Sequence, residues 1–310
     1  MITSIFKKST ILNYSLLVVL LLSVFFIYQT SDLYITMASN GLLKNSTLII
    51  LLLASFFLVN FMIKKNGLTK DSSYTILFFF LFLLIFPTSF NNLNLLFANF
   101  FLLLAMRRLI SLQTLKQPKE KIFDASLWIF IASLFHFWCI LFIILVYVSI
   151  IFHVSRDYRN WLLPFVAFVA TAIIFLFSSL VFGKTIWIDH ILSQTQTNFE
   201  LTYFTNHYQN IALSIYVVIA LYFLFSMIFS MTNRPMILQA SYKKMIFGFL
   251  IGMIVFLISP EKNNTLLLFT FMPLSVMCTT NIEYSQSKRY QEIVLLLMIF
   301  AGFFSFFSQL

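Results

Sequence analysis

This sequence is short of charged residues and of cysteine. Only 10% of its 310 residues are charged, whereas about 25% is usual in soluble domains. The two cysteines, Cys139 and Cys278, lie inside apolar runs, so no disulfide framework and no metal-type cysteine spacing exists. The sequence also lacks a glycine-rich phosphate loop, a His-Glu-x-x-His motif and a Gly-x-Ser-x-Gly motif. These absences argue against ATP-driven and metalloprotease functions, and we expect no cofactor and no metal.

What the chain has in abundance is apolar side chains. Hydrophobic residues make up 61% of it, and 41 residues are phenylalanine. Runs such as Ile76–Phe86 and Leu141–Phe152 are apolar on all sides and do not alternate with polar residues, which is typical of transmembrane helices and not of barrel strands. We therefore predict an all-α, polytopic transmembrane helix bundle that forms one integral membrane domain over residues 1–310.

The basic residues lie in short gaps between the apolar runs. A net charge of +10 could suggest a nucleic-acid partner, but this distribution is typical of membrane flanks, so we expect membrane lipids as partners and no nucleic acid. We predict about eleven spans, within a range of about nine to twelve. The predicted spans are Asn13–Gln29, Thr47–Ile63, Tyr74–Phe86, Asn91–Met106, Ala125–Phe137, Trp138–Phe152, Trp161–Phe182, Ile211–Met231, Met245–Ser259, Thr265–Thr279 and Ile293–Phe307.

The segment Ala125–Phe152 decides the topology. As one helix it would be about 42 Å long, which exceeds a hydrocarbon core of about 30 Å. If it crosses twice, with a tight turn near His136–Cys139, only Lys44, Lys184 and Lys262 of the 20 basic residues lie outside. Cytoplasmic loops are enriched in Lys and Arg. We therefore predict two crossings, a cytoplasmic N-terminus, a main basic cytoplasmic loop at residues 107–122 and a location in the bacterial inner membrane.

The longest predicted outer loop, residues 183–210, combines titratable, aromatic and amide side chains. Carboxylates and imidazoles move protons, while aromatic rings and amides suit sugar faces and hydroxyls. An extracytoplasmic site for a lipid-linked sugar needs this mixture, and an interfacial loop with an aromatic belt has the same composition. The candidate catalytic residues here are Asp189, His190, Glu200 and His207, and the candidate substrate-binding residues are Trp187, Tyr203 and Tyr208.

Two further candidate residues lie outside that loop. Asp32 directly follows the first predicted span, and membrane glycosyltransferases with polyprenyl-linked donors commonly carry acidic residues at that place. His136 lies at the predicted outer tip between two spans. A titratable group at membrane depth is a functional candidate because leaving it unsatisfied in lipid is costly, although water reaches an outer tip and weakens that argument.

Two resemblances follow from short patterns. The stretches Ala105–Leu109 and Phe123–His136 resemble the central part of bacterial O-antigen and exopolysaccharide polymerases, where an Arg-bearing helix end precedes a helix that closes in a Leu-Phe-His pattern. The whole chain resembles an uncharacterised family of flavobacterial (Bacteroidota) multi-pass inner-membrane proteins. The residues that carry the second resemblance are Met1–Phe6, Arg107–Leu109, Lys262–Asn264 and Met272–Leu274.

The leading hypothesis is an inner-membrane protein of envelope glycan or glycolipid assembly, similar to a polyprenyl-sugar transferase or polymerase. Asp189 or Glu200 would act as the base, Trp187 would stack on the sugar, and His136, His190 and His207 would assist. A non-catalytic subunit of a larger envelope complex for secretion or motility, bound to other membrane proteins, suits the sequence equally well. A small-molecule transporter is disfavoured because the predicted spans hold no Asp, Glu, Lys or Arg.

Overall fold

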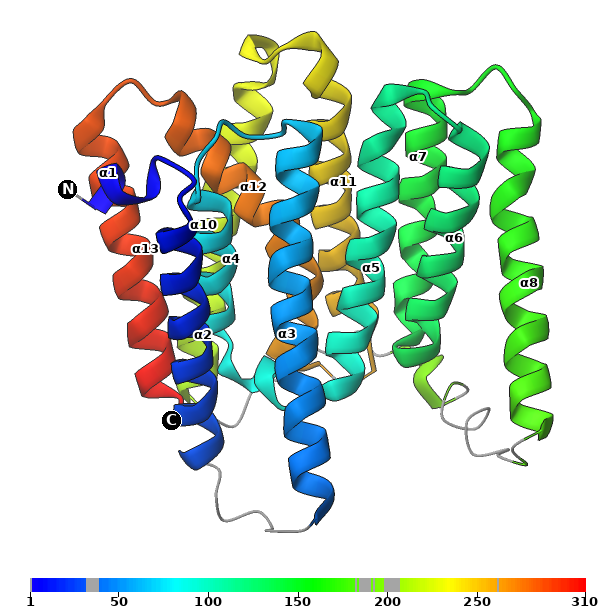
Figure 1. Cartoon of the computed structure of the whole chain (residues 1–310), viewed down its shortest axis with the longest axis horizontal. Helices are drawn as coiled ribbons and strands as arrows, with labels where there is room; N and C mark the ends of the chain where they lie inside the picture. Colours follow the sequence, from blue (N-terminus) through cyan, green and yellow to red (C-terminus); the bar gives the residue numbers. More distant parts are fainter. Residues whose placement is uncertain are drawn as a thin grey trace. The chain divides into compact units, whose positions relative to one another are not determined.

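The structure is a computed structural model in which helices make up nearly all of the described chain (Figure 1). It describes every residue except 1, 32–38, 182, 184–190, 192, 198–206 and 261. Within the described residues, eight helices are long and apolar enough to cross a membrane. The chain is therefore a multi-pass membrane protein by the length and composition of its helices.

The helices follow one another with short connections. The long ones are α2 (Ile11–Ser31), α3 (Ser39–Asn66), α5 (Leu93–Ser111), α6 (Pro118–Phe135), α8 (Arg159–Val181), α10 (His207–Phe229), α11 (Met236–Ile258), α12 (Leu268–Tyr284) and α13 (Lys288–Ser308). The shorter ones are α1 (Ile2–Phe6), α4 (Tyr74–Ile85), α7 (Ile143–His153) and the 3₁₀ turns η1 (Pro87–Phe90), η2 (Leu112–Thr114), η3 (Phe137–Phe142), η4 (Met231–Asn233) and η5 (Asn264–Leu267).

The chain forms two compact units. Unit 1 comprises Met1–Leu96, Tyr203–Arg234 and Phe271–Leu310, and unit 2 comprises Phe97–Thr202 and Pro235–Thr270.

The core of unit 1 is α4, a helix whose every residue is buried. Its sequence contains no charged residue and is apolar on all sides, so it can only lie inside a bundle or in lipid. The α13, α2 and α3 helices pack directly on it. The ring of Tyr216 on α10 meets Phe82 and Phe86 at centroid distances of 5.8 and 5.2 Å, which fixes α10 to the same core.

In unit 2, α6 packs along α8, and η3 and α7 pack on α11. The predicted turn between two helices is confirmed: α6 ends at Phe135, His136 is extended with φ −147° and ψ 109°, and η3 begins at Phe137. This break divides the doubtful segment into two helices. The number of crossings and the side on which the N-terminus lies remain predictions.

The predicted spans overlap helices throughout, but several helices are longer than predicted. The largest shift of a helix start is at α11, which begins at Met236 and not at Met245. Hydropathy marks where the apolar residues end, whereas a helix continues through polar residues as long as its backbone hydrogen bonds are made. As a result Lys244 lies inside a membrane-length helix.

Two glycines differ in the space around them, and this difference predicts a difference in stability. A Cβ at Gly252 would lie 2.6 Å from Thr270 Cγ2, and Thr270 is held because its hydroxyl donates to the Leu267 carbonyl. At Gly302 the nearest atom, Leu81 Cδ2, would be 3.4 Å away. We expect Gly252→Ala to lower the free energy of unfolding by about 1–3 kcal/mol and Gly302→Ala to be neutral or mildly stabilising, as measured by thermal unfolding in detergent. Equal unfolding midpoints for the two variants would contradict this packing.

Candidate functional site

His136 is a buried histidine at the break between α6 and η3. Its Nε2 lies 3.0 Å from the hydroxyl oxygen of Ser259, at the end of α11. That hydroxyl donates its single proton to the Val255 carbonyl at 2.8 Å. Ser259 must therefore accept from His136, so Nε2 carries the ring proton and Nδ1 keeps a lone pair that can accept one.

A side chain from the predicted outer loop contacts the residue that follows this histidine. The Oε1 atom of Gln194 accepts a hydrogen bond from the backbone N–H of Phe137 at 3.0 Å. The ring of Phe269 lies against His136 at a centroid distance of 5.9 Å. The indole nitrogen of Trp138 is buried and has no acceptor among the described residues. We call His136, Phe137, Gln194 and Ser259 the His136 site.

Most residues singled out from the sequence lie outside the described part of the chain. Of the others, His207 and Tyr208 begin α10 in unit 1, where both are exposed. His136 is thus the one candidate whose surroundings in unit 2 are described. No three His, Cys, Asp or Glu side chains among the described residues gather to hold a metal ion. The candidates outside the described residues are Asp32, Trp187, Asp189, His190, Glu200 and Tyr203.

Unit 2 also contains a buried lysine that the sequence analysis missed. Lys244 on α11 is 0% exposed, and its Nζ donates to the Leu109 carbonyl at 2.6 Å and lies 3.0 Å from His153 Nε2. Lys244 thus belongs to a helix that is long and apolar enough to cross a membrane, whereas the predicted span begins after it, at Met245. Neighbouring residues on a helix point about 100° apart. The pair Lys243-Lys244, once assigned to a helix, would therefore have indicated that the two lysines face different surroundings.

The ends of α5, α6 and α7 around Lys244 form the basic end of unit 2. Arg108 pairs with Asp124 at 2.8 Å, and Lys119 pairs with Asp157 at 3.1 Å. The backbone N–H of Arg159 and the Lys119 ammonium hold the pKa of the Asp157 carboxyl below its usual value. His136 lies at the far end of α6, a helix of 18 residues and hence about 27 Å long. The His136 site and the basic end thus lie at opposite ends of this unit.

Unit 1 has a polar network that joins three helices. The Tyr290 hydroxyl on α13 donates to Asn281 Oδ1 on α12 at 2.7 Å. It therefore accepts from the Tyr222 hydroxyl on α10, 2.6 Å away. The Asn281 amide in turn donates to the Ser226 hydroxyl, one helical turn from Tyr222. The sequence analysis missed this network because its members are separated by up to 68 residues and match no motif.

The buried lysine predicts a difference between two adjacent substitutions. Lys244→Met removes the donor to the Leu109 carbonyl and leaves His153 without its partner, which should lower the free energy of unfolding by about 1–3 kcal/mol. Lys243→Met, at an exposed neighbouring position, should change it by less than about 0.5 kcal/mol. Unfolding of the detergent-solubilised variants by heat measures both. If the Lys244→Met and Lys243→Met variants unfolded at the same temperature, the contacts of Lys244 would not contribute to stability.

Comparison with known proteins places the chain in a family without assigning it an activity. A family model described as a family of unknown function, DUF6427, matches residues 1–310. No curated protein matches the chain, and no solved structure does either.

Proposed function

The chain belongs to the DUF6427 family, and we propose that it acts in envelope glycan or glycolipid assembly, as a transferase or polymerase of sugars linked to a polyprenyl carrier. The reaction would take place at the His136 site, under the segment 183–210. The proposal places the protein in the bacterial inner membrane, with the His136 site on the outer face of that membrane.

The observation that supports this function best is the hydrogen bond from Phe137 to Gln194. It brings Gln194, a described residue of the segment with the most candidate residues, to the residue next to the buried His136. The Ser259 contact fixes the tautomer of His136. The ring proton is on Nε2, and Nδ1 is therefore the nitrogen that can accept a proton. A fixed tautomer is what general base chemistry requires of a histidine.

In such a transfer the acceptor hydroxyl attacks the anomeric carbon of the donor sugar. A carbon–oxygen bond to the acceptor forms, the carbon–oxygen bond to the carrier phosphate breaks, and the phosphate leaves with the bonding electron pair. The hydroxyl proton passes to a base on the protein. Asp189 or Glu200 is the proposed base, His136 assists through Nδ1, and Trp187 provides a ring for the sugar face.

The test is a substitution that keeps the hydrogen bond of His136 and removes its basicity. In His136→Gln the amide N–H can still reach Ser259, but no basic nitrogen remains. We expect formation of the lipid-linked glycan in a strain that depends on the gene to fall by about 10²-fold or more. Asp189→Asn or Glu200→Gln should have the same effect. Ser133→Ala is the matched control on α6, because among the described residues the Ser133 hydroxyl bonds to the Phe130 carbonyl of its own helix.

Affinity purification from native membranes in mild detergent distinguishes this function from that of a non-catalytic subunit. Bound polyprenyl-linked glycan that is retained with the purified protein supports the transferase. A stoichiometric set of protein partners without lipid-linked sugar, together with full activity of His136→Gln, would contradict it.

A further inference from the structure

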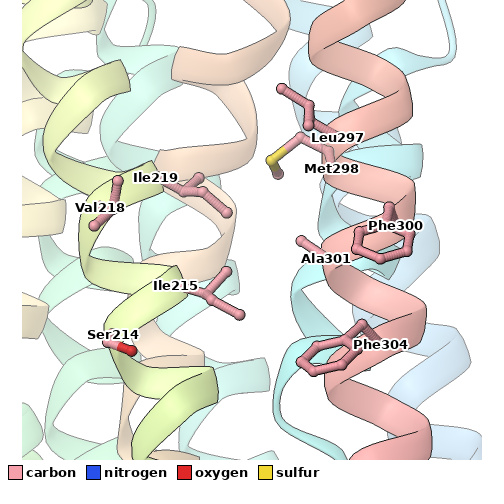
Figure 2. A pocket seen from close by; sticks show the side chains of 9 residues that line it. All are labelled: Ser214, Ile215, Val218, Ile219, Leu297, Met298, Phe300, Ala301 and Phe304. Atoms are coloured by element: carbon pink, nitrogen blue, oxygen red, sulfur yellow. The ribbon is translucent and has the colours of Figure 1, made fainter.

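A groove runs between α10 and α13 on unit 1. Figure 2 shows the two helices facing each other across a gap, with Ile215 and Ile219 pointing toward it from α10 and Met298 and Ala301 from α13. The hollow measures about 500 Å³ and has Ser214, Ile215, Val218 and Ile219 on one wall and Leu297, Met298, Phe300, Ala301 and Phe304 on the other. Small side chains, Ser214 and Ala301, leave the space that larger ones would fill.

The groove is closed at one end by a polar bridge between the same two helices. Tyr222 lies one helical turn from Val218, and Tyr290 lies two turns before Leu297, so both are on the faces that line the groove. Their hydroxyls are joined at 2.6 Å. Tyr222 is half exposed, which leaves its hydroxyl oxygen as an acceptor and its ring edge open to the surroundings.

Basic residues stand at this closed end. Lys288 and Arg289 are the first two residues of α13 and both are exposed. The acidic residue nearest in sequence, Glu292, accepts a hydrogen bond from Thr3 of α1 at 3.3 Å, so its carboxylate is engaged with another helix. The N-terminus of α13 adds a partial positive charge. An anionic group is therefore the complement of this end.

We propose that the groove binds one acyl chain of an anionic glycerophospholipid whose phosphate lies beside Lys288, Arg289 and the Tyr222–Tyr290 bridge. The groove residues Leu297 to Phe304 follow Tyr290 by 7 to 14 positions, or about 10–21 Å along the helix. One leaflet of the hydrocarbon core is about 15 Å deep. A chain anchored by its phosphate at the basic residues thus reaches the hollow and fills it.

The dimensions favour a single chain over other occupants. A helix of a second copy is about 10–12 Å wide with its side chains, whereas the Tyr222–Tyr290 hydrogen bond of 2.6 Å draws α10 and α13 together at one end of the groove. A polyprenyl chain would continue into the second hollow, which shares Phe300 and Phe304 with the first and is lined by Tyr208, Phe303, Phe307 and Ser308. This inference does not rest on the proposed function, because the groove and the His136 site lie in different units.

The test is native mass spectrometry of the full-length protein in detergent, titrated with phosphatidylglycerol or phosphatidylcholine of identical chains. We expect the protein to bind phosphatidylglycerol at least fivefold more tightly. Ala301→Phe fills the groove and should weaken the binding of both lipids about tenfold. The double variant K288Q/R289Q should weaken only the binding of phosphatidylglycerol, by about tenfold.

Matched variants control for folding and for net charge. Leu296→Phe adds a ring to the exposed side of α13 that does not line the groove, and K65Q/K243Q removes two exposed charges elsewhere. Both should bind as the wild type does. If Ala301→Phe unfolds at a lower temperature, Ser214→Leu fills the same space from α10.

Three outcomes overturn the proposal. The first is equal affinity for the two lipids, and the second is wild-type binding by both Ala301→Phe and Ser214→Leu. The third is complete displacement of phosphatidylglycerol by an equimolar polyprenyl phosphate, which would assign the groove to that carrier. If the lipid assay fails while His136→Gln still loses glycan formation, the proposed function stands, so the two inferences fail separately.

Discussion

Hydrocarbon offers no hydrogen bonds, so each polar side chain within a span must find its partner inside the protein. Many serines and threonines among the described residues solve the problem locally: Ser126, Ser149 and Thr279 each donate to the carbonyl four residues earlier in their own helix. Such bonds satisfy the hydroxyl but place no two helices together. Polar side chains that bond across helices instead mark where helices meet, as His136, Lys244 and the Tyr222–Tyr290 pair do.

Aromatic packing joins the helices of unit 1 in the part of the core that has no hydrogen bonds between the helices described above. Phe82, Phe86 and Phe271 surround Tyr216 with ring centroids at 5.2–6.0 Å, an arrangement whose edge-on contacts are favourable beyond the area that they bury. Gly302 allows α13 to approach the same core at Leu81. Because α10 and α13 both rest on α4, small side chains between them leave the hollow of about 500 Å³.

The fold could be predicted well from the sequence because lipid imposes a simple rule on it. Apolar runs become helices, and the length of Ala125–Phe152 together with the distribution of charge predicted the break at His136. The rule fails at helix ends. The first turns of α11 carry Gln239, Ser241 and Lys243, which a hydropathy argument assigns to a loop, although these residues form helix readily.

The candidate site could be predicted only in part, because single-residue arguments do not report which side chains meet. His136 was identified from its position, but its partner Ser259 is 123 residues away and resembles any other serine in an apolar run. Gln194 drew no attention beside the titratable residues of the same segment, and yet it is the residue that contacts Phe137. Long-range hydrogen bonds of this kind leave no local trace in the sequence.

The position of His136 also limits the chemistry that could occur there. The site lies at the end of unit 2 opposite the basic residues, and under the proposed orientation that end faces away from the cytoplasm and its ATP. A transfer reaction at that face needs a donor that brings its own leaving group. A sugar bound to a carrier through a phosphate ester meets this requirement, because cleavage of the sugar–phosphate bond drives the transfer and the carrier keeps the donor in the membrane. The location of the histidine and the class of donor proposed for it are therefore linked by the same topology.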